Sequence, residues 1–332
     1  MTVEPFVSYA QNGEDVILWR ALGHVRDGRY VDVGAADPEV DSVTKAFVDR
    51  GWRGIDVEPV PQYAERLREA RPLNEVVQAA ITHEAVGELV LHVFEGTGLS
   101  TADDKVAQGV SWMSAEDMVV SACSLDDICA SSGLLAGEIH FLKIDVEGSE
   151  ASVLRSFALD KWRPWVVVVE STLPNSSVQS FDPWDGLLVD AGYVLALFDG
   201  LNRYYVSPDH PELQESLSYP ACVLDRYEKV AHVRLAQQTR IAQTELSRWR
   251  NMAIGGFAES TAVAQAAAAN EVNLRKKVRR LDDQLEVTRE KLFAVRKTNK
   301  SLQAKLARLE SHLEVRIRRR AARIARRARG RS

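Results

Sequence analysis

Three acidic residues follow an apolar, strand-like run in IHFLKIDVEGSE, residues 139–150. Burying a carboxylate is costly unless it is paired or protonated, so Asp145, Glu147 and Glu150 need a reason to be there. Residues i and i+2 of an extended chain share a side, which places Asp145 beside Glu147. Glu150 falls in the first turn of a predicted helix, where the helix dipole favours an anion. We therefore predict Asp145 as a general base or base-orienting acid, and Glu147 as a residue that positions cofactor or substrate.

Three further side chains near this run bear on its chemistry. Lys143 lies within the strand, and we expect it to pair with a carboxylate, which would hold Asp145 ionised. His140 precedes the core of the strand and is expected to be structural. Glu170 ends the next apolar run, WVVVVE, and is a secondary candidate at the same rim. Paired acids also suit Mg²⁺, but without a histidine or a third dedicated ligand the sequence predicts no metal site.

A second motif, YVDVGAADP at residues 30–38, follows the pattern of a strand that ends in a tight turn. Glycine at position 34 lets a ligand approach the backbone closely. The motif is not the dinucleotide fingerprint GxGxxG, because Ala36 holds the place of the second glycine. A pyrophosphate cradle for NAD or FAD is therefore poorly supported. Asp32, on the strand before the turn, is placed to meet a cation.

An acidic residue, Glu58, ends the second predicted strand in the motif DVEP, 24 residues after Gly34. A carboxylate at this place can accept hydrogen bonds from both hydroxyls of a ribose. The pair of motifs describes a pocket for a nucleoside that carries a positive charge and no phosphates. S-adenosylmethionine, with its ribose, sulfonium and ammonium groups, fits that description. Either motif alone is also ordinary turn chemistry.

The elements that must position these residues alternate between strands and helices. Strands are predicted at 30–34, 54–58, 76–81, 118–124, 139–145, 165–170, 193–198 and 203–206, with a hairpin-like piece at 87–95. Helices are predicted at 41–50, 61–70, after Gly148 and at 183–191. This alternation predicts an α/β fold with a doubly wound sheet. The turn DGLN between the last two strands predicts that they form an antiparallel hairpin.

Seven blocks of the chain, in order, resemble the FkbM family of S-adenosylmethionine-dependent O-methyltransferases. They are SYAQNGEDVILWRAL, YVDVGAADPEVDSVTKAF, GWRGIDVEPVP, GLSTAD, IHFLKIDVEGSE, RPWVVVVEST and DGLNRYYV, within residues 8–206. The resemblance implies a Rossmann-like, seven-stranded methyltransferase sheet with an antiparallel last strand. It also implies a hydroxyl acceptor on a polyketide, a sugar or a surface glycan. The cofactor contacts that it implies are Asp32, Gly34, Ala35 and Glu58, with Gln11 and Ala80 as weaker candidates.

Charge and composition divide the chain of 332 residues. Residues 1–230 hold 17 Lys/Arg and 38 Asp/Glu, whereas residues 231–332 hold 25 Lys/Arg and 9 Asp/Glu. Such asymmetry separates a globular domain from an interaction tail. Three cysteines without CxxC spacing argue against a disulfide framework or a zinc site. The N-terminus lacks the pattern of a signal peptide, and no apolar stretch is long enough to span a bilayer, so we expect a cytoplasmic protein.

A heptad repeat begins at Leu274. Its a positions are Val278, Leu285, Leu292, Asn299, Leu306 and Leu313, and its d positions are Leu274, Leu281, Thr288, Val295, Leu302 and Leu309. Apolar residues at this 3.5-residue spacing predict a coiled coil, and one Asn at an a position favours a parallel dimer. The alternative is one long helix that packs back on its own domain. We predict a homodimer through a coiled coil of ~65 Å over residues 274–316.

The chain ends in RIRRRAARIARRARGRS, which holds nine arginines in the 17 residues 316–332. One interpretation is a solvated basic end, and another is a helix on an anionic membrane surface, such as the inner membrane face. Nucleic acid is not expected, because no base-reading motif or aromatic platform accompanies the arginines.

The sequence thus predicts four regions. They are a methyltransferase domain over 1–222, a helical connector over 223–273, a parallel dimeric coiled coil over 274–316 and an arginine-rich tail over 317–332. The predicted function is S-adenosylmethionine-dependent O-methylation of a sugar hydroxyl in a cell-surface glycan, or of a secondary metabolite. The alternatives are a nicotinamide-dependent sugar-modifying enzyme and a catalytically inactive scaffold dimerised by its coiled coil.

Overall fold

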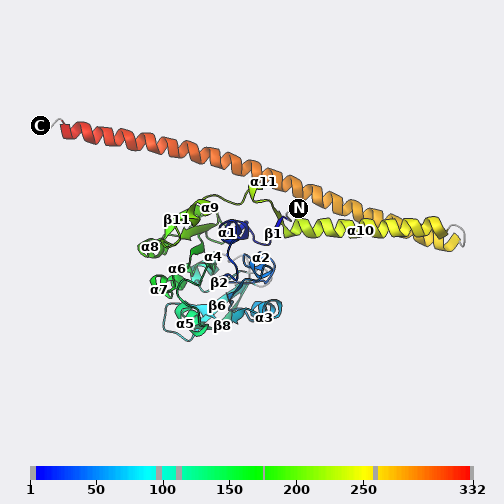
Figure 1. Ribbon diagram of the computed structural model, residues 1–332, viewed down its shortest axis with the longest axis horizontal. Coiled ribbons are helices and arrows are strands. Elements are labelled where there is room, and N and C mark those ends of the chain that lie inside the picture. Colours follow the sequence, from blue (N-terminus) through cyan, green and yellow to red (C-terminus); the bar gives the residue numbers. More distant parts are fainter. Residues whose placement is uncertain (1–4, 95–98, 110–113, 175, 257–260, 330–332) are drawn as a thin grey trace. The chain divides into compact units, whose positions relative to one another are not determined.

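A computed structural model of the chain describes residues 5–94, 99–109, 114–174, 176–256 and 261–329. The chain divides into two compact units, Met1–Val230 and Ala231–Ser332 (Figure 1). The first unit contains the mixed α/β fold, and the second consists of helices. Each unit is described by itself below.

The first unit is built on a sheet of seven strands. They are β2 (Arg29–Val33), β3 (Arg53–Val57), β4 (Glu75–Val77), β9 (Phe141–Ile144), β10 (Val166–Glu170), β11 (Val194–Phe198) and β12 (Asn202–Val206). Their order across the sheet is β11-β12-β10-β9-β2-β3-β4. The last strand of the chain in this sheet, β12, runs antiparallel to both of its neighbours. This arrangement confirms the predicted Rossmann-like methyltransferase sheet.

Alternate side chains of the central strands enter two separate cores, as strand pleating requires. Val31 of β2 and Leu142 of β9 face one core, whereas Tyr30 and Phe141 face the other. The first core is completed by α5 (Leu125–Ser131), α6 (Glu150–Arg155), α7 (Leu159–Trp162) and α8 (Asp185–Asp190). The second is completed by α1 (Glu14–Leu22), α2 (Lys45–Val48) and α9 (Leu213–Leu217). Because both faces are covered, a strand such as β10 is apolar at consecutive positions.

Two predicted strands form, but a second sheet of four strands takes all of one and part of the other. This sheet contains β5 (Ala80–Ile81), β6 (Glu88–Phe94), β7 (Ser100–Thr101) and β8 (Ala115–Cys123), in the order β5-β8-β6-β7. The strand predicted at 76–81 divides, so that β4 joins the large sheet and β5 joins the small one. The strand predicted at 118–124 is β8, which pairs antiparallel with β6 instead of entering the large sheet. Local periodicity identifies a strand but not its partner, which explains both errors.

The N-terminal segment closes the first unit against residues beyond 222, where the methyltransferase domain was predicted to end. Strand β1 (Phe6–Ser8) pairs with β13 (Tyr227–Lys229), which follows the short 3₁₀ helix Val223–Asp225. Arg20 of α1 donates to both carboxylate oxygens of Asp225 at 3.0 Å. These contacts extend the compact unit to Val230.

A buried ion pair fixes the loop after β2. Arg71, at the end of α3 (Pro61–Ala70), lies 2.5 Å from a carboxylate oxygen of Asp56 on β3, and both side chains are almost fully buried. The same guanidinium donates to Ser42, Thr44 and the carbonyl of Pro38. A buried charge is tolerated when it is paired and hydrogen-bonded in this way. The network therefore holds the loop that leads from β2 to α2.

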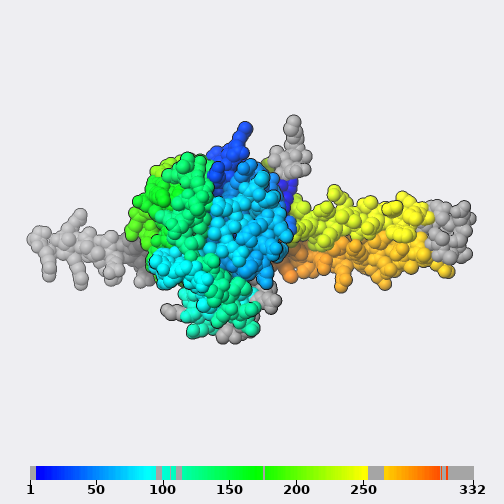
Figure 2. Space-filling view, turned by 90° about the horizontal axis from the view of Figure 1, so that it is seen from below, coloured from blue at the N-terminus to red at the C-terminus, as the bar shows by residue number. Residues whose placement is uncertain are grey.

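The second unit contains two long helices, α10 (Val230–Gly256) and α11 (Thr261–Arg329). They lie side by side over the length of α10, as both views show (Figures 1 and 2). Ala242 of α10 and Ala267 and Leu281 of α11 are buried there. The predicted coiled-coil range 274–316 is helical throughout, and α11 continues into the basic tail. The predicted connector instead comprises β13, α10 and the start of α11. No helix in the described part of the chain is both long and apolar enough to cross a bilayer.

Candidate active site

The first predicted motif forms a turn that has no room for a side chain. Gly34 follows β2 with φ of 82°, and a Cβ atom there would lie 1.8 Å from the carbonyl oxygen of Asp145. The backbone N–H groups of Gly34 and Ala35 donate to the carbonyl of Val57 at 3.0 and 3.1 Å. The ends of β2, β3 and β9 are thereby drawn together. Glycine is needed here both for the left-handed conformation and for the close approach.

Glu58 lies at the end of β3 with its carboxylate held in place from two sides. One oxygen accepts a hydrogen bond from the N–H of Ala36 and the other from the N–H of Val60, each at 2.8 Å. The side chain is buried, and burial raises its pKa to about 7 against the pull of these hydrogen bonds. Each carboxylate oxygen keeps a further lone pair with which to accept a hydrogen bond from a ligand.

These turns open on one cavity at the carboxyl ends of β2, β3 and β9. Five residues selected from the sequence line it, namely Gly34, Glu58, Ala80, Asp145 and Glu147. A wall that the sequence did not predict comes from the small sheet and the segment after it. Leu89 and Leu91 of β6, Ser100 of β7 and Ala102 form this wall. The cavity thus combines an apolar wall with an acidic edge, a common composition for a small-molecule site.

Three predicted cofactor residues do not line this cavity. Gln11 is exposed, and its carbonyl accepts a hydrogen bond from Lys229. Ala35 is buried, whereas its neighbour Ala36 lines the cavity. Asp32 is buried at the end of β2, where it accepts a hydrogen bond from Thr44 at 3.0 Å. A resemblance between sequences cannot distinguish a residue that touches a ligand from its neighbour that supports the loop.

The cation that Asp32 meets is Lys143. The Lys143 ammonium lies 3.3 Å from Asp32 and 3.3 Å from Asp145, and it donates to the carbonyl of Gly34 at 3.0 Å. Burial lowers the pKa of Lys143, but the two carboxylates outweigh burial and raise it above its ordinary value. Lys143 is therefore charged at neutral pH and orients Asp145, as the sequence led us to expect.

The acidic turn after β9 is strained. Glu147 has φ of 51°, a left-handed conformation that is uncommon for a residue with a side chain, and Gly148 follows with φ of 103°. The hydroxyl of Thr101 donates to the carbonyl of Glu147 at 2.6 Å and holds this turn. Glu150 begins α6 and accepts a hydrogen bond from the N–H of Gly148 at 2.9 Å, which fits its predicted place at a helix start. Backbone strain of this kind is concentrated at functional sites.

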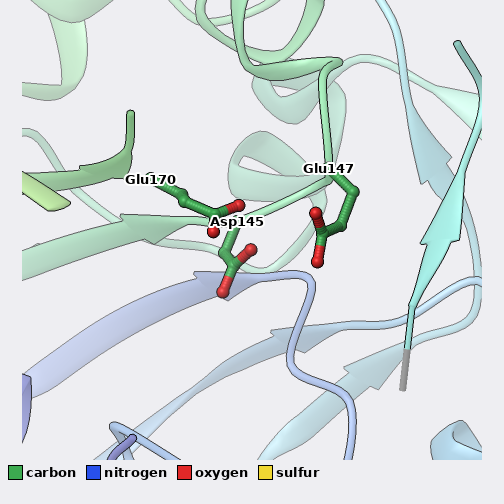
Figure 3. A group of neighbouring side chains, drawn as sticks. All are labelled: Asp145, Glu147 and Glu170. Carbon is green, nitrogen blue, oxygen red and sulfur yellow. The ribbon is translucent and has the colours of Figure 1, made fainter. Parts of the chain in front are cut away.

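Glu170 from β10 joins Asp145 and Glu147 to form a cluster of three carboxyl groups (Figure 3). One oxygen of each lies within 4.8 Å of one oxygen of each of the others. Burial, and then the charge of Asp145, raise the pKa values of Glu147 and Glu170. From the sequence, Glu170 is a secondary candidate at the end of its strand, and β10 pairs in parallel with β9 beside the acidic turn. Neighbouring parallel strands end at the same edge of a sheet, and this is the signal in the sequence that identifies Glu170.

The close approach at Gly34 predicts a specific loss of stability. Gly34→Ala should lower the free energy of unfolding by at least about 3 kcal/mol, because it adds a backbone clash to the cost of a left-handed alanine. Gly51→Ala is the matched control, since Gly51 has φ of 87° but nothing within 4 Å of the added Cβ atom. That variant should lose only about 1–2 kcal/mol. Urea denaturation followed by tryptophan fluorescence measures both, and equal losses would contradict the proposed contact.

Comparisons with known proteins identify a methyltransferase domain. The profile of the methyltransferase FkbM domain matches residues 32–195, which run from the end of β2 to the start of β11 and include the residues that line the cavity. No curated protein matches the chain. Among solved structures, a TehB-like SAM-dependent methyltransferase from Corynebacterium glutamicum matches with 9% identity and a TM-score of 0.31, over 58% of this chain and 87% of that chain. The chain therefore carries a methyltransferase FkbM domain over residues 32–195.

Proposed function

We propose that this domain transfers a methyl group from S-adenosylmethionine to a hydroxyl oxygen, and that the acceptor is a sugar of a cell-surface glycan or a secondary metabolite. The observation that carries the proposal is the single cavity that joins Gly34 and Glu58 to the acidic edge at Asp145 and Glu147. The family match supports methyl transfer. The hydroxyl oxygen, and the glycan or metabolite that bears it, are proposed beyond the family match.

The residues present fit S-adenosylmethionine. Glu58 offers two oriented oxygens to the ribose hydroxyls, and Gly34 lines the cavity with it. Ala80 and Leu91 line the cavity with apolar surface that suits the adenine ring. When bound, the cofactor supplies an electrophilic methyl group.

On the acceptor side, Asp145 is placed to take or orient the proton of the hydroxyl. Its carboxylate is held by Lys143 on one oxygen, and its side chain keeps 35% of its exposure at the cavity. Glu147 lies beside it and positions the acceptor. In the transfer, the acceptor O–H bond breaks as its proton passes to a carboxylate or to water, and the new O–CH₃ bond forms as the S–CH₃ bond breaks. Holding oxygen and methyl in line can supply ~7–11 kcal/mol of the barrier reduction.

The two alternatives are weaker. A nicotinamide-dependent enzyme would need a pyrophosphate cradle, and the turn at Gly34 has Ala36 instead of the second glycine of that motif. An inactive scaffold would not need the acidic edge, yet Asp145 is oriented by a buried lysine and lines the cavity with Glu58. Both observations favour an active transferase.

We further propose that a second copy of the chain covers the exposed part of the heptad repeat in α11. Val295, Leu302 and Leu306 are more than half exposed although they occupy a and d positions. The earlier heptad positions are partly buried, and α10 lies beside that part of α11. An apolar stripe that keeps its 3.5-residue spacing past the end of α10 requires a partner with the same spacing. Asn299, at an a position within this stripe, favours a parallel pair.

Contact of the basic tail with an anionic membrane stays a prediction.

The function test is transfer of a labelled methyl group from S-adenosylmethionine to glycan extracts and to free sugars. The native chain should label a hydroxyl-bearing acceptor. Asp145→Asn should bind the cofactor with unchanged affinity but lose at least ~100-fold in transfer rate, because it removes the proton acceptor. Calorimetry measures the affinity. Equal loss of binding and transfer would reassign Asp145 to cofactor binding, and label on nitrogen alone would contradict O-methylation.

Cofactor affinity should depend on the protonation of Glu58. Its pKa of about 7 means that the carboxylate, which accepts from both ribose hydroxyls, is present above neutral pH and lost below it. Affinity should therefore fall up to ~tenfold per pH unit below about pH 7. In Glu58→Gln the affinity should be lower at high pH, and this part of the pH dependence should disappear. Ionisation of the ligand itself affects both proteins equally, so identical pH profiles would exclude Glu58 from the binding site.

The dimer proposal is tested by sedimentation equilibrium of the full chain. Leu302→Glu should weaken association at least ~tenfold, because it buries an unpaired charge in the seam. Phe293→Glu is the control, since Phe293 is also exposed but lies at a b position outside the seam. That variant should associate like the native chain. A native chain that is monomeric at every concentration would rule the dimer out.

A further inference from the structure

We propose that Asp145, Glu147 and Glu170 bind one divalent cation of the oxygen-preferring type, such as Mg²⁺ or Mn²⁺. The site lies at the carboxyl ends of the neighbouring strands β9 and β10. Binding of the cation stands independently of the proposed O-methylation. Its role in catalysis rests on that function.

The geometry is that of a ligand set drawn from three directions. Glu170 reaches toward Asp145 from the neighbouring strand, and Glu147 extends from the turn beside them (Figure 3). Their nearest oxygens all lie within 4.8 Å of one another. Oxygens on opposite sides of a Mg²⁺ or Ca²⁺ ion are ~4–5 Å apart, since each bond is ~2.0–2.6 Å. A cation therefore fits among these carboxylates with small rotations of the side chains.

Unsatisfied buried oxygens give an independent sign of a missing ligand. Glu170 is only 8% exposed, and its Oε2 atom has no hydrogen-bond partner in the described part of the chain. The Oε2 atom of Glu147 is also buried without such a partner. Leaving a buried polar atom unsatisfied costs about 1–3 kcal/mol, and more when it is charged. A bound cation would satisfy both oxygens at once.

Lys143 forms no salt bridge with these two residues in the described part of the chain, although its charge lowers the pKa of Glu147 against the larger effect of burial. Lys143 is bound by Asp32, Asp145 and the Gly34 carbonyl. Within the described residues, no ion pair is formed by Glu147 or Glu170. In the empty site, burial and the charge of Asp145 favour the protonated forms of Glu147 and Glu170. A divalent cation would displace these protons and bind all three carboxylates at once.

The cation would also be accessible to an acceptor. Asp145 and Glu147 line the cavity, whereas Glu170 approaches from the buried side. Three protein ligands leave positions for water or for the acceptor hydroxyl in a six-coordinate ion. Coordination lowers the pKa of a hydroxyl, so its proton leaves more readily to a carboxylate or to water. Asp145 would then act on the acceptor through the cation.

Cation binding is measured by calorimetric titration of Mg²⁺ or Mn²⁺ into the full chain, after removal of metals and without cofactor or acceptor. The native chain should bind one equivalent. Glu170→Gln should bind the cation ~tenfold or more weakly yet retain its affinity for S-adenosylmethionine, which also shows that it is folded. Glu58→Gln should instead bind the cation with native affinity and S-adenosylmethionine more weakly. If Glu170→Gln does not fold, Glu147→Gln takes its place with the same expectation.

Three results would overturn the proposal. The first is that no heat of binding is measured up to ~10 mM cation, a concentration above the dissociation constants of weak sites. The second is that Glu170→Gln binds the cation with the affinity of the native chain. The third is that the transfer rate stays at its native value when a chelator is present. The first two reject the site, and the third rejects its catalytic role. Cation binding without transfer to any hydroxyl would instead support the site while rejecting the proposed function, so the two failures are distinguishable.

Discussion

The rest of the site depends on the ion pairs that the buried ammonium of Lys143 forms with Asp32 and Asp145. It joins the end of β2, through Asp32 and the Gly34 carbonyl, to the end of β9, through Asp145. The ion pairs would be too costly in an apolar interior if either side were missing. Because they are complete, two loops that would repel each other are held against one another. The cavity opens where these loops meet.

The acidic edge beyond Lys143 holds more carboxyl groups than the described residues pair with cations. Desolvation raises the pKa values of Glu147 and Glu170, and Asp145 raises them further. Such a site is destabilising when empty and gains free energy from any cationic ligand. A divalent cation is a ligand of this kind. The strained turn at Glu147 also costs free energy, because its left-handed backbone is unfavourable. That backbone places the Glu147 carboxylate at the edge of the cavity.

Different kinds of packing stabilise the two units. In the first, strands covered on both faces bury consecutive valines, and the ion pair of Arg71 with Asp56 lies within this interior. In the second, a helix of 69 residues depends on a narrow apolar stripe that α10 covers only in part. A stripe of this kind stabilises a helix when another helix packs on it. The first unit thus buries the apolar faces of its large sheet within one chain, whereas α11 leaves apolar heptad positions such as Leu302 exposed.

The amino-acid sequence by itself determined the main strands and the edge of the sheet at which Gly34, Glu58 and Asp145 meet. It could do so because apolar runs mark parallel strands and because the carboxyl ends of such strands share an edge. The tertiary structure decided the rest. It divided the predicted strand 76–81 between two sheets, made β6 a wall of the cavity and brought Glu170 within reach of Asp145 and Glu147. These are contacts between segments far apart in the chain, and local patterns carry no information about which distant segment supplies the partner.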